Sequence, residues 1–267
     1  MQKVNKKFIP DMPLSVVIIT KNEAHIIGKT LLSLQGIANE IIIVDSGSTD
    51  ATLSVCRQFN TTIIETTWDG FGNNKNKGIE AAKHDWILSL DADESINEAL
   101  KAAIIHLPLN NSNEIYSLKR KNVFCGKIIR FGNWGSDQQI RIFNRKAAKW
   151  DDAYVHESLT FFEPVKKLKL PGSLIHYTVH SLEEYIGKTI NYAKLNAKKY
   201  HLQKKKANYF KLIFSPAFTF FVHYILRLGF LDGWEGYFIA KTNAWYTFLK
   251  YMYLRDLNKN NNIIQLN

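Results

Sequence analysis

The sequence has few cysteines and lacks long apolar runs. Its 267 residues include only Cys56 and Cys125, which excludes a disulfide framework and a zinc site built from cysteines. We interpret both as ordinary thiols in a reducing cytosol. No uncharged apolar run reaches the roughly 18 residues that a membrane span needs, so we expect no span. The run at residues 14–19 is also shorter than the apolar core of a signal peptide, about 7–15 residues, so we do not expect export.

Acidic residues are missing from one long segment, residues 185–231. The chain carries 35 lysines and arginines against 24 aspartates and glutamates, a formal net charge of +11. Nine positive charges lie within this segment, so the rest of the chain carries only +2 (11 − 9). The nine are Lys188, Lys194, Lys198, Lys199, Lys204, Lys205, Lys206, Lys211 and Arg227. The hydrophobic fraction of 46% excludes a wholly disordered chain. The basic character therefore belongs to one C-terminal segment.

The residues around these lysines indicate their partner. Residues 204–206 are lysines, and they precede an aromatic and aliphatic stretch at 210–226. Lysines beside such a stretch are typical of a segment that lies on an anionic bilayer surface. Pro216 and Glu235 count against a simple span. A solvated basic helix and a nucleic-acid-binding face are the alternatives. Because no motif of a nucleic-acid-binding module is present, we expect an anionic membrane surface as partner and no nucleic acid.

The first half of the chain alternates between strand-like and helix-like patterns. Short apolar runs rich in β-branched residues, typical of buried strands, occupy residues 14–20, 40–45, 61–65 and 86–90. Apolar residues with helical spacing lie between them, at 24–34, 53–59 and 74–83. This alternation predicts βαβ units and a mostly parallel, doubly wound sheet.

The second half has a different pattern. Residues 114–124, 127–131, 139–143 and 168–176 are expected to form strands separated by turns, and a long helical region begins at Ser181. We therefore predict an α/β fold, with a Rossmann-like mixed sheet and a helical, basic and aromatic C-terminal extension that associates with membranes. The division that follows is a catalytic domain at 1–178 and a helical region at 179–267.

Polar residues gather where three of the predicted strands end. The first strand is followed by Thr20, Asn22 and Glu23, the second ends in Asp45, and the fourth is followed by a segment with two more carboxylates. In open α/β sheets, ligands bind beyond the carboxyl ends of the strands. We therefore expect these side chains to line one crevice. Asp45 suits a hydrogen bond to a nucleobase or a ribose hydroxyl, or else a structural turn.

Two carboxylates after the fourth strand suggest a metal site. Asp91 directly follows the run 86–90, and Asp93 lies two residues further on. Oxygen ligands in such a sparse site suit Mg²⁺ or Mn²⁺, which would neutralise a diphosphate leaving group. Asp50 is better suited to a structural part near the start of a helix. Lys75 could reach a phosphate, or could equally be a solvent-facing helix residue.

Three segments in this order resemble family 2 glycosyltransferases with the GT-A fold. They are SVVIITKNE at 15–23, IIVDSGSTDAT at 42–52 and DWILSLDADE at 85–94, and the resemblance covers residues 14–177. Further segments are similar to the lipopolysaccharide inner-core β-glucosyltransferases. These are WDGFG at 68–72, Trp134 with Asp137 and Arg141-Ile-Phe143, VHE at 155–157, and GFLDGWEG at 229–236.

The resemblance implies an inverting transfer of a sugar, glucose from UDP-glucose, to a lipid-linked acceptor such as the lipopolysaccharide core. The enzyme would be cytoplasmic and peripheral on the inner face of the cytoplasmic membrane. By the same match, Thr20, Asn22, Glu23 and Asp45 hold the nucleotide, with Lys75 and Asp91 nearby. Asp91 and Asp93 hold a Mg²⁺ or Mn²⁺ ion, with Asp93 the better ligand. The family's third metal contact would correspond to His176.

The general base of such a transfer is less clearly marked. Many family 2 enzymes carry a Glu-Asp pair after the sheet, and this chain has none there. By position we favour Glu157, with Asp137 as the alternative; His156 could orient Glu157. A salt bridge from Glu157 to a nearby arginine or lysine, such as Arg141, is the competing structural interpretation.

Two other functions are compatible with the same residues. The acceptor could be a polyprenyl-phosphate lipid or another surface polysaccharide. A chain with a degenerate site could instead be a non-catalytic module that binds nucleotide or membrane. The intact pair of Asp91 and Asp93 favours an enzyme.

Overall fold

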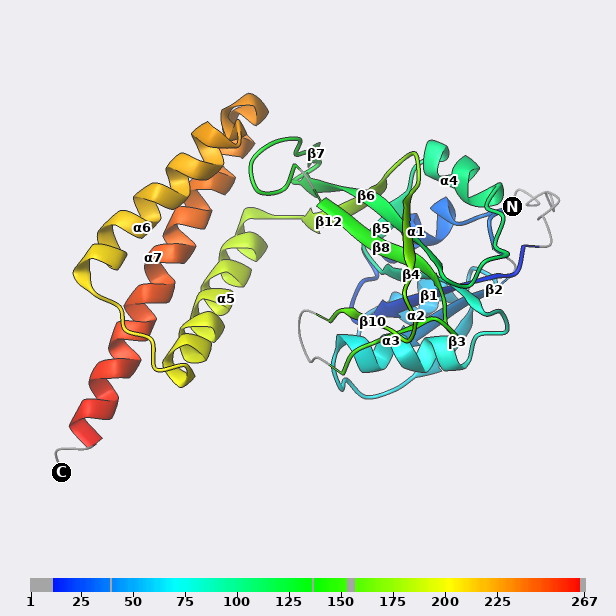
Figure 1. Cartoon of the computed structure of the whole chain (residues 1–267), viewed down its shortest axis with the longest axis horizontal. Helices are drawn as coiled ribbons and strands as arrows, with labels where there is room; N and C mark the ends of the chain where they lie inside the picture. Colours follow the sequence, from blue (N-terminus) through cyan, green and yellow to red (C-terminus); the bar gives the residue numbers. More distant parts are fainter. Residues whose placement is uncertain (1–11, 39, 136, 153–156, 265–267) are drawn as a thin grey trace. The chain divides into compact units, whose positions relative to one another are not determined.

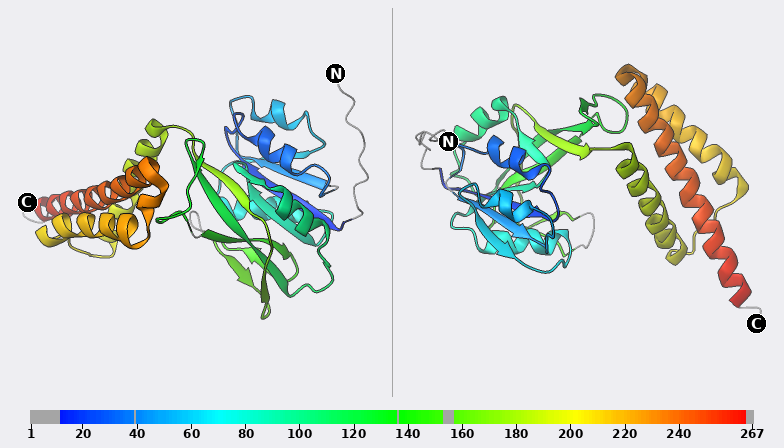
Figure 2. Two further views of the ribbon diagram at one scale, coloured as in Figure 1. Left: turned by 90° about the horizontal axis from the view of Figure 1, so that it is seen from above. Right: turned by 180° about the vertical axis from the view of Figure 1, so that it is seen from behind.

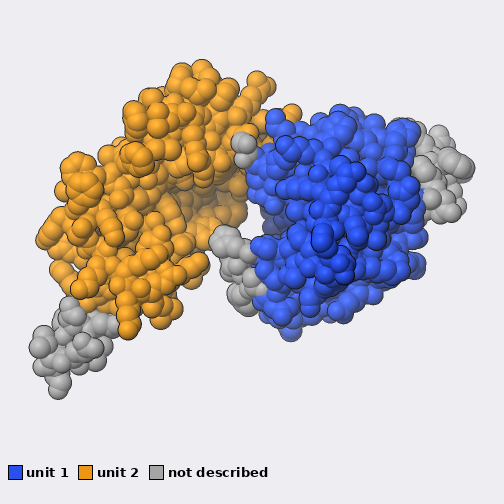
Figure 3. Space-filling view, in the orientation of Figure 1, with its two compact units in different colours: residues 1–120, 137–176 blue, residues 121–136, 177–267 orange. Residues whose placement is uncertain are grey.

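The computed structural model describes residues 12–38, 40–135, 137–152 and 157–264, and side chains up to residue 259. The chain forms two compact units (Figure 3). Unit 1 comprises residues 1–120 and 137–176, and unit 2 comprises residues 121–136 and 177–267. The sequence-based division at residue 178 assigned 121–136 to the first part, whereas these residues group with the C-terminal helices.

Four parallel strands form the first half of the sheet in unit 1. Their order is β3-β2-β1-β4. They are β1 (Leu14–Thr20), β2 (Glu40–Asp45), β3 (Thr62–Glu65) and β4 (Trp86–Asp91). Every residue of β1 is buried, as expected for a β-branched run covered on both faces. The predicted parallel arrangement is confirmed.

The sheet continues beyond β4 in the order β8-β6-β12-β5. The pairings of β4 with β8, β8 with β6, and β12 with β5 are antiparallel. The strands are β5 (Glu94–Ile96), β6 (Glu114–Phe124), β8 (Asp137–Asn144) and β12 (Leu174–Val179). Shorter strands are β7 (Lys127–Ile128), β9 (Ala148–Trp150), β10 (Leu159–Phe161) and β11 (Lys166–Lys169). The strand expected at 168–176 is split into β11 and β12, because Gly172, with φ of +89°, turns the chain between them.

Helices cover both faces of the sheet (Figures 1 and 2). Three of them, α1 (Ile27–Ser33), α2 (Thr52–Cys56) and α4 (Glu98–Ile105), share a core with Val16 and Ile18 of β1. The opposite side chains of β1, Val17 and Ile19, pack with α3 (Phe71–Glu80). The alternation along one buried strand thus builds two cores.

Unit 2 consists mainly of three helices, α5 (Leu182–Leu202), α6 (Tyr209–Phe221) and α7 (Gly233–Ile264). The α7 helix packs against both α5 and α6 (Figure 1). Ser181 caps α5 by accepting a hydrogen bond from the Glu184 N–H, which confirms the predicted start. A π-helical turn (Val222–Leu226) follows α6, and a 3₁₀ turn (Gly229–Asp232) precedes α7.

One helical segment, Tyr209–Leu226, is long and apolar enough to cross a membrane, judged by length and composition alone. This corrects the expectation that no segment meets that criterion. Its only lysine or arginine, Lys211, lies in the first turn, and the remainder contains no Asp, Glu, Lys or Arg. Only 6% of the segment is buried within the protein, so its apolar side chains are not those of a core helix.

Candidate active site

The ends of the first, second and fourth strands meet at one edge of the sheet, as predicted. The parallel register pairs Thr20 with Asp45 and Ile19 with Asp91. The hydroxyl of Thr20 is buried and has no hydrogen-bond partner among the described residues. An unpartnered buried hydroxyl at this edge is a group that a ligand could satisfy.

Asp45 and Asn22 tie the loops after β1 and β2 together. The Asp45 carboxylate accepts hydrogen bonds from the N–H groups of Gly47 (3.0 Å) and Ser48 (2.8 Å). Asn22 adopts a left-handed conformation with φ of 57°, which asparagine tolerates. Its Oδ1 accepts a hydrogen bond from the Thr49 N–H at 2.8 Å. Both predicted nucleotide-binding residues therefore shape the loops at the strand ends.

Glu23 and Asp50 extend the same loop structure. The Glu23 N–H donates to the hydroxyl of Thr52 at 2.8 Å. Asp50 accepts hydrogen bonds from the N–H groups of Thr52 (2.9 Å) and Ala24 (3.2 Å). The structural part predicted for Asp50 is therefore confirmed.

Asp91 lies between two cations. Its Oδ2 accepts a hydrogen bond from Nη2 of Arg141 at 2.7 Å, and its Oδ1 lies 3.0 Å from Nζ of Lys75. Burial of Asp91 opposes its ionisation, but the charges of Arg141 and Lys75 outweigh that cost and hold its pKa well below the usual carboxyl range. Asp91 is therefore a fixed anion.

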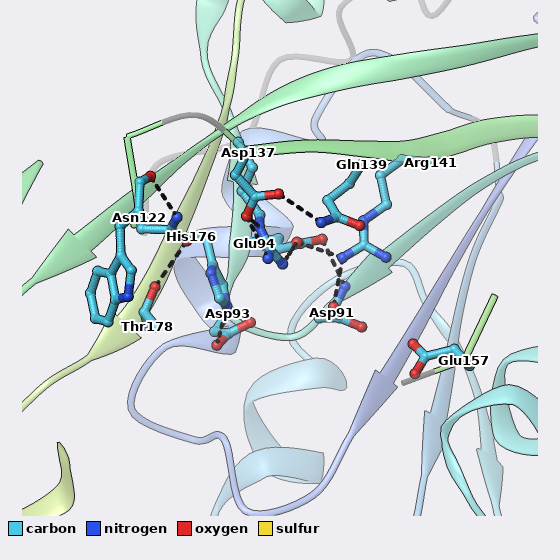
Figure 4. A network of polar contacts seen from close by, with 12 residues as sticks. Asp91, Asp93, Glu94, Asn122, Asp137, Gln139, Arg141, Glu157, His176 and Thr178 are labelled. Atoms are coloured by element: carbon cyan, nitrogen blue, oxygen red, sulfur yellow. Dashed lines mark hydrogen bonds and ion pairs between the residues drawn. The ribbon is translucent and has the colours of Figure 1, made fainter. Parts of the chain in front are cut away.

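A buried charge network continues from Arg141 (Figure 4). Its Nη2 also donates to Glu94 at 2.6 Å, and the Glu94 side chain is fully buried. Arg120 lies 3.3 Å from Glu94 and holds Asp137 through two nitrogens, each at 2.6 Å. Gln139 donates to the other oxygen of Asp137 at 2.7 Å. Asp137, the alternative base, is thus bound by an arginine and an amide.

Glu157 lies beside Asp91, and their carboxylates face each other in Figure 4. Its Oε1 accepts a hydrogen bond from Nζ of Lys75 at 2.6 Å. The Glu157 side chain is 15% exposed. The salt bridge that the structural alternative proposed for Glu157 is therefore present, with Lys75 as the cation and not Arg141. The adjacent His156 lies outside the described residues.

Asp93 and His176 form a separate pair. Nε2 of His176 lies 3.2 Å from Oδ2 of Asp93. Burial of His176 works against its protonation, but the hydrogen bond and charge of Asp93 prevail and raise its pKa above the ordinary histidine value. Within the described residues, no group of three or more His, Cys, Asp or Glu side chains is arranged to hold a metal ion. Asp91, the third predicted ligand, faces Lys75 and Arg141 instead.

Lys75 is a buried helix residue with charged partners, and it does not face the solvent. It is 1% exposed, and its ammonium group contacts Asp91, Glu157 and, at 4.6 Å, the ring centroid of Trp150. The sequence alone does not decide whether Lys75 faces a phosphate or the solvent. It also gives no local signal for the contacts of Glu94 and Arg120, because burial and long-range pairing distinguish them only in the folded chain.

An open α/β sheet with loops and charged side chains gathered at its strand ends is the arrangement in which proteins of the nucleotide-binding type hold their ligands. Comparison with known proteins narrows this class. Residues 15–168 match the family described as Glycosyl transferase family 2. The chain is 32% identical over 254 residues to the lipopolysaccharide core biosynthesis glycosyltransferase LpsC of Rhizobium meliloti, covering 90% of this chain and 91% of that protein. The chain therefore belongs to glycosyl transferase family 2, with the GT-A-like fold that its motifs indicated.

Two further similarities span most of the chain. An uncharacterized glycosyltransferase of Rickettsia felis is 29% identical over 264 residues, covering 94% of this chain and 93% of that protein. S. aureus TarS 1-349, whose structure was solved in complex with UDP-GlcNAc, is 15% identical with a TM-score of 0.45, covering 94% of this chain and 92% of that one.

Proposed function

We propose that the protein transfers glucose from UDP-glucose to a lipid-linked acceptor, the lipopolysaccharide core. The family supports a glycosyl transfer, and the relative from Rhizobium meliloti, named for lipopolysaccharide core biosynthesis, supports the acceptor class. The observation that carries the chemistry is the carboxylate of Glu157. It faces Asp91 at the strand-end edge and is partly exposed, so a substrate hydroxyl can reach it.

In this reaction Glu157 accepts the proton of the acceptor hydroxyl while the hydroxyl oxygen attacks the anomeric carbon of the donor. The new carbon–oxygen bond forms as the bond from that carbon to the diphosphate breaks, and UDP leaves with the electron pair. Asp137 is less suited to this part because Arg120 and Gln139 already occupy its two oxygens. Thr20, with its unpartnered hydroxyl, and the loops held by Asp45 and Asn22 would bind the nucleotide.

A Mg²⁺ or Mn²⁺ ion suits part of the predicted ligand set. Asp93 and His176 bring a carboxylate oxygen and an imidazole nitrogen within 3.2 Å of each other, and both are metal ligands. Asp91 fits less well, because Arg141 and Lys75 already contact its oxygens. We propose that Asp93 and His176 hold the ion, which supplies positive charge for the departing diphosphate.

The test is a panel of UDP- and GDP-sugars with Mn²⁺ or Mg²⁺, read out as released nucleoside diphosphate. UDP-glucose is expected to be turned over, and Asp93→Asn is expected to abolish turnover. Asp85→Asn is the matched control, because Asp85 pairs with the surface cation of Lys146. If no donor releases nucleoside diphosphate, the proposed activity is overturned. An unchanged rate of release in Asp93→Asn would overturn the metal assignment alone.

We further propose that α6 lies on an anionic membrane surface, where a lipid-linked acceptor is found. An outward stripe of large apolar side chains, each 42–65% exposed, recurs at helical spacing along α6 and the π-helical turn that follows it. The stripe consists of Phe210, Phe214, Phe218, Phe221 and Ile225. The exposed lysines at 204–206 precede it, and both features are typical of an interfacial helix.

Flotation with anionic vesicles at physiological salt tests this surface. The protein is expected to float, and replacement of the three lysines at 204–206 by glutamine is expected to abolish flotation. The lysines at 166, 167 and 169 are exposed in unit 1, so their replacement is the matched control. Release of the protein from the vesicles by alkaline carbonate would identify a peripheral protein. Retention on the vesicles would favour a membrane span through Tyr209–Leu226. A wild-type protein that does not float would refute the membrane surface.

A further inference from the structure

The α3 helix carries three residues on one face that all contact the segment leading to Glu157. They are Gly72, Lys75 and Asn76, which recur at the i, i+3 and i+4 positions and therefore share one side of the helix. The other contacts come from β9 and the residues after it. Nucleotide binding does not account for this face. Its first residue, Gly72, is the last residue of WDGFG, one of the segments that carry the family resemblance.

Asn76 fixes the helix to the backbone of β9. Its Nδ2 donates to the Trp150 carbonyl at 2.9 Å, and its Oδ1 accepts from the Trp150 N–H at 3.1 Å. One side chain thus satisfies both backbone groups of a residue that is 5% exposed. Such a two-bond contact sets the position of Trp150 along the helix as well as its distance.

Gly72 lets Asp151, the residue after Trp150, approach the helix closely. A Cβ atom at Gly72 would lie 1.8 Å from the carbonyl oxygen of Asp151 and 3.6 Å from Cβ of Glu157. Real Cβ atoms do not come so near a backbone oxygen, so any larger residue would displace the segment that carries Glu157.

Lys75 completes the contact through charge. Its ammonium group is buried, and it lies 2.6 Å from Glu157, 3.0 Å from Asp91 and 4.6 Å from the ring centroid of Trp150. A buried cation is stable only with such partners. The charge of Lys75 is therefore already paired within the protein. Lys75 joins two carboxylates that would otherwise repel each other.

We propose that Gly72, Lys75 and Asn76 form a positioning face, which holds the carboxylate of Glu157 beside Asp91 in the orientation that accepts the acceptor's proton. Lys75 acts through Glu157 and does not bind the donor. This inference rests on the proposed function, in which Glu157 is the base.

The inference is tested with the purified full-length protein by comparing Lys75→Met with Lys77→Met. Lys77 lies on the same helix, is about one third exposed, and pairs with Asp69 at 2.8 Å. Lys75→Met is expected to lower kcat by about 100-fold, the scale of a misplaced general base. The dissociation constant for UDP, measured by calorimetry, should change less than about threefold, and Lys77→Met should resemble the wild type.

A double-mutant cycle separates positioning from a general structural effect. In the Glu157→Gln background, adding Lys75→Met should lower kcat by less than about threefold, because the residue through which Lys75 acts has already been removed. Gly72→Ala leaves every charge in place and is expected to lower kcat with unchanged UDP affinity. This variant also serves if Lys75→Met does not fold.

The outcomes separate the two proposals. A wild-type protein that turns over no donor overturns the proposed function and this inference with it. An active wild type with Lys75→Met equal to Lys77→Met overturns the inference alone. So does weaker UDP binding with unchanged kcat, which would make Lys75 a phosphate ligand, and so do fully additive effects in the cycle.

Discussion

Replacement of Arg141 by methionine is the sharpest test of the charge network. Methionine keeps much of the volume of the arginine side chain and removes its charge. Asp91 would lose its contact at 2.7 Å and Glu94 its contact at 2.6 Å. Each carboxylate keeps a second cation, Lys75 at 3.0 Å and Arg120 at 3.3 Å respectively.

The expected loss follows from these remaining contacts. Breaking a buried ion pair by removing one partner costs roughly 3–5 kcal/mol. Because both carboxylates keep a cation, we expect the low end, about 3 kcal/mol in the free energy of unfolding. For a domain of this size that corresponds to a decrease in Tm of about 6–12 °C.

The pH dependence of the loss has a definite sign. The folded protein holds the pKa of Asp91 below its usual value, so the stabilisation from this group is present above the ordinary carboxyl pKa and is lost as the pH falls toward the lowered one. In Arg141→Met the first of the two cations that lower the pKa of Asp91 is gone, so this pKa should rise toward the ordinary carboxyl value. The difference in stability between variant and wild type should therefore be largest near pH 7 and shrink in acid.

Urea denaturation at pH 7 and at pH 4 measures both effects. Lys146→Met is the control, because its ammonium pairs with Asp85 at the surface and is 71% exposed; its effect should stay within about 0.5 kcal/mol. A loss below about 1 kcal/mol for Arg141→Met at pH 7, or a loss that is the same at both pH values, would refute the reasoning.

Three further predictions concern other parts of the chain. Gly78→Ala should destabilise by about 1–3 kcal/mol in urea, because the added Cβ would lie 2.4 Å from Val17. Native protein at pH 8 should be alkylated at the exposed Cys125 and not at the buried Cys56, whose pKa burial raises to about 11; mass spectrometry counts the adducts. Asp232→Ala should cost about 1–3 kcal/mol in urea, since its carboxylate accepts hydrogen bonds from the backbone N–H groups of Arg130 and Phe131.

The strands that the sequence predicted best are those with continuous apolar runs. Residues 14–20 and 40–45 form β1 and β2 with the predicted bounds, because a strand buried on both faces needs an unbroken apolar stretch. Strands β9 and β10 were not predicted. Each has three residues, too few for any periodicity to appear.

The sequence predicts where the candidate site lies but not which cation pairs with which carboxylate in it. The strand ends identified Asp91 and Asp93, since parallel strands bring their carboxyl ends to one edge. The partner of Asp91 is Arg141, 50 residues away, and the partner of Glu157 is Lys75, 82 residues away. Local patterns carry no information about contacts at such separations, so only the folded chain reveals which cation meets which anion.

The order of strands in the sheet determines which strands of the nascent chain can pair first. Strands β1 to β4 pair with one another and can associate once Asp91 has been synthesised. The free edge of β4 then stays unpaired until β8 (137–144) is synthesised, and β5 stays unpaired until β12 (174–179) is synthesised. During this interval, open strand edges are exposed to unwanted pairing. Asp91 and Glu94 also lack Arg141 until it leaves the ribosome, so the charge balance of the site is completed late in synthesis.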